Sequence, residues 1–129
     1  MREIKFRGKK IDGEWYYGDL IKETREFNRT CDKVYILPYW ATLNGPIFVD
    51  KETVGQYTGL KDTNGVEIYN GDITKGLNRL WEVVVVENVH YLNGCFMFGN
   101  YNAHEFLNKH QNIEVIGNIY ENLELLEGE

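Results

Sequence analysis

The chain has 129 residues, 43% of them hydrophobic and 14% aromatic, which is typical of one folded globular domain that needs no metal or disulfide staples. Its formal net charge is −6. Because phosphate contacts from Lys and Arg dominate affinity for nucleic acid, this charge disfavours a nucleic-acid partner.

The charge is divided unevenly along the chain. Residues 1–64 hold eleven Lys and Arg against ten Asp and Glu, whereas residues 65–129 hold three against ten. The exception to the acidic character is a basic cluster at the amino end, made of Arg2, Lys5, Arg7, Lys9 and Lys10. These cations could meet phosphate, but they alternate with Ile4 and Phe6, as the solvated face of a strand does. We therefore interpret them as a sheet surface.

Nothing in the sequence predicts export or membrane insertion. The amino end lacks an apolar stretch of signal-peptide length, and the longest apolar run, Val83 to Val86, is too short to cross a bilayer. Cys31 and Cys95 lie far apart without a Cys-x-x-Cys spacing, so free thiols are expected. The sequence thus predicts a cytoplasmic protein with no membrane contact.

The first predicted element is a β-hairpin over residues 6–21. A strand from Glu3 to Ile11 is followed by Asp12-Gly13, a pair that favours a tight turn, and by a return strand from Trp15 to Ile21. Folding about this pair puts Gly8 opposite Tyr17. After the hairpin, the polar segment from Lys22 to Asp32 is predicted to be a loop.

The middle of the chain predicts a strand, a short segment and a second hairpin. The strand runs from Lys33 to Trp40, where Pro38 indicates an edge or an end, and the segment is Ile47 to Val49. The second hairpin covers residues 57–74, and its tip Asn64-Gly65 suits a type I′ turn in which Thr63 faces Val66.

The two hairpins share a sequence motif. Residues 6–21 and 57–74 both contain an aromatic residue, a glycine, a lysine, an Asp/Asn-Gly pair and then a Tyr-x-Gly-Asp run. This agreement indicates an internal repeat of one hairpin.

The remaining elements are three strand candidates and one helix. Gly76 to Arg79 is predicted as a connection, and Leu80 to Val89 as a strand buried on both faces because Val83 to Val86 is all β-branched. Asn88 or Asn93-Gly94 can turn the chain into a strand from Cys95 to Phe98.

A short helix is predicted over residues 102–110, where Asn102 can cap it, Glu105 completes a capping box, and Phe106 and His110 share a face. A last strand follows from Ile113 to Ile119, with Gly117 as a bulge or close approach. The acidic tail forms a last turn of helix or frays.

Three phrases resemble one family. YTGLKDTNGVEIYNGDI, the opening REIKFRGK and the closing IEVIGNIYEN together resemble the YopX family, small proteins encoded largely by phages and prophages of Gram-positive bacteria. The resemblance implies a single domain over residues 1–129 with a mainly β fold of half-barrel or SH3-like character. It implies no established activity and no catalytic residues.

Catalytic and metal-binding patterns are absent from the sequence. His90, His104 and His110 lack the spacing of a zinc site, and the glycines form no phosphate-binding loop, so no metal, cofactor or catalytic residue is predicted. The repeated Gly-Asp, at Asp19 and Asp72, keeps a small hydrolase as an alternative, although each carboxylate can instead bond backbone amides.

Surface aromatics give the preferred functional interpretation. Tyr16 and Tyr17 point to opposite faces of one strand, as do Tyr39 and Trp40, so one of each pair is a candidate surface aromatic. The sequence predicts a non-catalytic protein-binding or assembly module with binding residues Tyr17, Tyr39 and Trp40, whose partner is a host or phage protein. Free sheet edges also predict a homo-oligomer. A nucleic-acid-binding accessory protein remains the other alternative.

Overall fold

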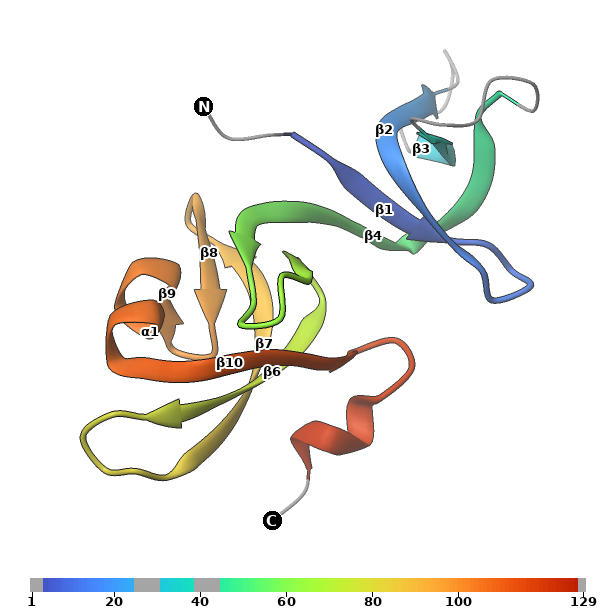
Figure 1. Ribbon diagram of the computed structural model, residues 1–129. Helices are drawn as coiled ribbons and strands as arrows, with labels where there is room; N and C mark the ends of the chain where they lie inside the picture. The colour runs from blue at the N-terminus through green and yellow to red at the C-terminus, as the bar shows by residue number, and fades with distance from the viewer. Residues whose placement is uncertain (1–3, 25–30, 39–44, 128–129) are drawn as a thin grey trace. The chain divides into compact units, whose positions relative to one another are not determined.

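The computed structural model describes residues 4–24, 31–38 and 45–127, which form two compact units, residues 1–57 and 58–129 (Figure 1). The protein is mainly β, with antiparallel sheets and one short α-helix, as the sequence predicts. The strands of the first unit are β1 (Phe6–Lys9), β2 (Trp15–Thr24), β3 (Cys31–Pro38) and β4 (Ile47–Lys61), the last of which continues into the second unit. The second unit adds β5 (Glu67–Tyr69), β6 (Asp72–Asn78), β7 (Val84–Leu92), β8 (Cys95–Phe98), β9 (Tyr101–Asn102), α1 (Ala103–Lys109), β10 (His110–Asn118) and a 3-10 helix, η1 (Leu123–Leu126).

The paired strands of the first unit form a closed series, because the last strand pairs with the first. β1 pairs with β2, β2 with β3, β3 with the start of β4, and β4 from Asp50 to Gln56 pairs with β1. Inside this circuit Val34, Ile36 and Val49 form a core, against which partly buried residues such as Phe6 and Tyr16 pack. The SH3-like character remains a prediction with which this pairing is compatible.

Both hairpin tips are built in the same way. The backbone N–H of Lys10 donates to Glu14 O (2.8 Å) and that of Asp62 donates to Val66 O (2.8 Å), so three residues form each loop. The third of them is a glycine with φ of +100° in the first loop and +84° in the second. Only this position is left-handed, so the predicted two-residue type I′ turn is wrong.

The longer loop shifts the register by one residue. Gly8 lies opposite Tyr16, not Tyr17, and Arg7 lies opposite Tyr17. In the second hairpin Val66 bonds Asp62 rather than facing Thr63. The return arm of this copy is short, because Gly71 adopts φ of +100° after β5 and the chain enters the other sheet as β6.

The second unit packs α1 on a five-stranded sheet of order β10-β6-β7-β8-β9 (Figure 1). Its core is aromatic at the centre, with the Phe98 and Phe106 rings stacked at 4.7 Å between centroids and the His110 ring stacked on Phe106 at 4.1 Å. Helix α1 begins after Asn102, whose Oδ1 accepts a hydrogen bond from Glu105 N, as the sequence predicts.

Several predicted boundaries are wrong. The predicted loop from Lys22 to Asp32 is strand at both ends, because β2 continues to Thr24 and β3 begins at Cys31. Glu23 pairs with Lys33 as two exposed polar residues, and the exposed Lys22 pairs with the buried Val34. The segment predicted at Ile47 to Val49 is the first part of the long strand β4. The strand predicted from Lys33 is confirmed as far as Pro38, and the rest of its predicted range lies outside the described residues.

The predicted connection from Gly76 to Arg79 is also wrong, since β6 runs to Asn78 and β7 starts only at Val84. The valine run is not buried on both faces, because Val83 and Val84 are exposed.

The later turns follow the predicted sites more closely. Asn93 and Gly94 both have positive φ, and Leu92 lies opposite Cys95, so the two-residue loop occurs here. Strand β10 shifts register next to Gly117, and a side chain there would collide with Asn122, which confirms both a bulge and a close approach. Among the described residues no helix is long and apolar enough to cross a membrane.

Candidate functional site

A pocket of about 320 Å³ in the second unit brings together aromatic and basic side chains. We call it the Trp81 pocket, and it is lined by Asn78, Arg79, Leu80, Trp81, Tyr101, Asn108 and Lys109. These residues come from the end of β6, the β6–β7 turn, β9 and the end of α1. In Figure 1 the turn is the loop that joins the β6 and β7 arrows.

Asn78 shapes the turn that carries Trp81. Its Oδ1 accepts hydrogen bonds from Leu80 N (3.0 Å) and Trp81 N (2.9 Å), and its backbone bonds Val83 O and Glu82 N. Asn is suited to this position because its short side chain mimics a turn of backbone. The turn therefore holds the Trp81 indole outward, where 71% of the residue is exposed to solvent.

The opposite wall comes from β9 and α1. The backbone N–H of Arg79 donates to Lys109 O (2.8 Å), which fixes the turn against the end of the helix. Lys109 Nζ lies 5.5 Å from the centroid of the Tyr101 ring, and Arg79 Nη1 donates to Gln111 Oε1 over a long 3.5 Å. Two cations and two aromatic rings thus line one pocket.

A buried histidine contacts Asn78, one of the residues that line the pocket. His110 is 1% exposed, its Nδ1 lies 3.0 Å from Phe106 O, and its Nε2 lies 3.4 Å from Asn78 Nδ2. A carbonyl can only accept, so Nδ1 carries the proton and Nε2 accepts from the Asn78 amide. The sequence expectation of one packed histidine and an exposed helix surface is confirmed, since His104 is exposed and contacts Asn108.

The carboxyl group of Glu87 has a raised pKa. Burial is the main cause, and the neighbouring His110 and His90 oppose it. The carboxylate fills the space that a side chain at Gly99 would occupy. No group of three His, Cys, Asp or Glu side chains among the described residues has the geometry to hold a metal ion.

We expect Glu87→Gln to make stability less dependent on pH. A carboxyl whose pKa is raised on folding favours the native state below its ordinary value of 4.5 and loses that contribution as pH rises through the folded pKa. Since the group is partly solvated, the melting temperature at neutral pH should rise by only about 1–3 °C. Thermal unfolding at several pH values from 4.5 upward tests this, with the exposed Glu124→Gln as control. A variant whose melting profile parallels that of the parent protein would contradict it.

The predicted binding residues have different outcomes. Tyr17 is 41% exposed on β2, while Tyr16 packs against the core, so the two-face argument is confirmed for this pair. Tyr39 and Trp40 lie outside the described residues.

The repeated aspartates have different surroundings within their own units. Asp72 is 2% exposed, and its Oδ2 accepts a 2.7 Å hydrogen bond from Tyr69 N. Asp19 is an exposed residue of β2 in the other unit. The structural role that we favoured is confirmed for Asp72, whose carboxylate is withdrawn from any substrate.

The basic cluster is not a solvated face throughout. Arg7 is buried, with its guanidinium carbon 4.8 Å from the centre of the Trp15 ring, and Lys5 Nζ lies 5.4 Å from that of Tyr57. The interpretation of the cluster as wholly solvated is therefore wrong for Arg7. Because Arg7 is buried, it is not available to phosphate.

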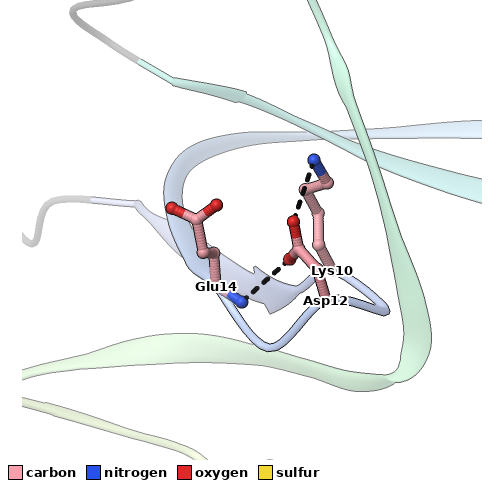
Figure 2. A network of polar contacts seen from close by, with 3 residues as sticks. All are labelled: Lys10, Asp12 and Glu14. Carbon is pink, nitrogen blue, oxygen red and sulfur yellow. Dashed lines mark hydrogen bonds and ion pairs between the residues drawn. The ribbon is translucent and has the colours of Figure 1, made fainter.

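Lys10 belongs to a second hollow, of about 510 Å³, at the tip of the first hairpin. Lys10 Nζ lies 3.4 Å from Asp12 Oδ2, and the other Asp12 oxygen accepts a hydrogen bond from Glu14 N (3.1 Å). Figure 2 draws both contacts as dashed lines. The Glu14 amide is the largest cause that lowers the Asp12 pKa, and the hydrogen bond to Asp12 raises that of Lys10. The cation here is already paired, which makes this hollow a weaker candidate than the Trp81 pocket.

The family model described as YopX protein matches residues 5–127. The chain belongs to the YopX family. A search of curated proteins finds no match for it. Among solved structures, this YopX-family chain is similar to that of protein EF1440 from Enterococcus faecalis, with 23% identity, a TM-score of 0.60, and coverage of 98% of this chain and 99% of that one. This likeness shows the shared fold.

Sequence reasoning missed the Trp81 pocket in this YopX-family protein. It placed Leu80 and Trp81 inside a buried strand, whereas Asn78 ends β6 and starts the turn. One signal was present: two of the three cations in residues 65–129 are Arg79 and Lys109, and Arg79 stands two residues before a tryptophan.

Proposed function

We propose that the protein is a non-catalytic binding module of the host cytoplasm whose partner is another protein. The observation that carries this proposal is the exposed apolar surface of the β6–β7 turn, which we call the Trp81 turn: Leu80, Trp81, Val83 and Val84. These four residues are each at least half exposed and lie within residues 80–84, where only Glu82 interrupts them. Contiguous exposed apolar surface is typical of interaction sites.

The chemistry of the surrounding residues also favours a protein partner. Trp, Tyr and Arg are the side chains on which binding energy concentrates in protein interfaces, and the Trp81 pocket contains one of each. Hydrogen bonds from Leu80 N and Trp81 N to the Asn78 side chain fix the backbone that carries the tryptophan before a partner arrives. Such ordering reduces the entropy lost on binding.

Tyr17 is a second candidate anchor, on the first unit. It is less exposed than Trp81, at 41% against 71%. The two candidates make separable predictions, because they lie in different units.

Trp81→Ala should weaken partner binding by at least about 2 kcal/mol, the usual scale for a buried aromatic anchor, and leave the fold intact because the side chain is exposed. The measurement is capture from a lysate of the natural host with parent and variant proteins, followed by titration of the purified partner. Leu123→Ala, an exposed apolar change on η1, is the control, and Tyr17→Ala tests the other candidate.

Three results would contradict the proposal. Capture that is equal for the parent protein and Trp81→Ala would remove the turn from the interface. Recovery of nucleic acid in place of protein would show that the partner is a nucleic acid and not a protein. Light scattering that shows a dimer lost on Trp81→Ala, with no other protein captured, would make a second copy of this chain the occupant and the protein a self-assembling one.

A further inference from the structure

The Trp81 pocket concentrates positive charge in an otherwise acidic half of the chain. Residues 65–129 contain ten Asp and Glu and three cations, Lys75, Arg79 and Lys109. Two of these three line the pocket, and Lys75 stands exposed on β6 outside it. A negatively charged partner would therefore be repelled by most of this half and attracted at the pocket.

Both cations are placed for an incoming group. The hydrogen bond from Arg79 N to Lys109 O holds their backbones together, so their side chains start from one rim of the pocket. Arg79 makes its described side-chain contact with an amide oxygen at 3.5 Å, and Lys109 lies over the Tyr101 ring. A carboxylate would offer a stronger hydrogen bond to either cation than an amide or a ring does.

We infer that the Trp81 pocket binds an acidic segment of a protein partner, with a carboxylate on Arg79 and Lys109 and an apolar side chain against the Trp81 indole. This inference rests on the proposed function and specifies the partner. A polypeptide fits better than a small anion, because the apolar surface continues to Val83 and Val84, beyond the residues that line the pocket. Two cations among ten carboxylates are too few for a nucleic-acid strand.

The test uses the full chain and a displayed library of short random peptides. Selection on the parent protein should enrich peptides that carry Asp or Glu next to a large apolar residue, and Trp81→Ala should lose this enrichment. Enrichment that depends on Trp81 but shows no acidic preference would overturn the inference and keep the proposed function. No enrichment over Trp81→Ala would count against both.

Charge variants give the quantitative test with an enriched peptide. Arg79→Gln and Lys109→Gln should each weaken binding about tenfold, whereas Lys75→Gln, which removes the same charge outside the pocket, should leave the affinity within about twofold. Changing the acidic residues of the peptide to Asn and Gln should reproduce the loss without altering the protein. Raising the ionic strength from about 0.1 M to about 1 M should also weaken binding. Equal effects of Arg79→Gln and Lys75→Gln would show a general charge effect and overturn the inference.

Discussion

Asp62→Ala should lower the free energy of unfolding by about 3 kcal/mol, a large fraction of the stability of a domain of this size. The Asp62 carboxylate is 8% exposed and accepts three backbone hydrogen bonds. Oδ1 bonds Asn64 N (2.8 Å) and Val66 N (2.9 Å) inside the hairpin tip, and Oδ2 bonds Val115 N (2.9 Å) on β10. Alanine would leave these donors without their acceptor.

Urea unfolding checks this prediction through a lower midpoint at an unchanged slope. Asp12→Ala is the matched control, since Asp12 stands at the tip of the related hairpin but is exposed and accepts one backbone bond, from Glu14 N. It should cost less than about 1 kcal/mol. Asp62→Asn should fall between the two, because its amide keeps one oxygen for the tip and cannot accept from Val115. Equal losses for Asp12→Ala and Asp62→Ala would refute the argument.

The repeated hairpin could be predicted because its signal is local. Gly13 and Gly65 mark both tips, and the hydrogen bonds across the two tips are equivalent. The loop length was not predictable in the same way, since Asp-Gly and Asn-Gly serve both two-residue and three-residue loops. Because the loop is one residue longer than predicted, the cross-strand partner of Gly8 is Tyr16 and not Tyr17.

The predicted strand limits were wrong where strand formation depends on pairing with residues that are distant in the sequence. The residues Lys22 and Glu23 have polar side chains and no apolar alternation, yet they form strand because β3 pairs with them. The valine run shows a different error. A run of β-branched residues predicts a strand but not which of its side chains are buried, and Val83 and Val84 are exposed. Pairing and burial are properties of the assembled sheet.

The candidate site was only partly predictable for the same reason. The two-face argument identified Tyr17 correctly as an outward aromatic. The Trp81 pocket instead requires β9 and the end of α1 to meet the β6–β7 turn, and the bond from Arg79 N to Lys109 O joins residues thirty positions apart. No local residue spacing in the sequence predicts that these three elements lie together.

The two glycines of the repeated Gly-Asp pairs meet different physical demands. Gly71 has φ of +100° and turns the chain between β5 and β6. Gly18 lies in the middle of β2, paired with Phe6 on one side and Pro38 on the other. A Cβ atom on Gly18 would lie 2.8 Å from Leu37 C and 2.9 Å from Pro38 Cα, and closer still to Leu37 O. Gly18 is therefore required for close approach of two strands.

Gly18→Ala should consequently destabilise the first unit by about 2–4 kcal/mol, because backbone atoms of β3 cannot rotate away as a side chain can and the two strands must separate. Gly13→Ala is the control: no atom lies within 4 Å of its Cβ position, so it carries only the cost of a left-handed φ, about 1 kcal/mol. Hydrogen exchange of β2 and β3 amides measures the effect where it arises, and the Gly18→Ala variant should lose protection on both strands. Retained protection on β2 and β3 in that variant, with losses no greater than in Gly13→Ala, would show that the strands can accommodate the methyl group and that the close approach does not require glycine.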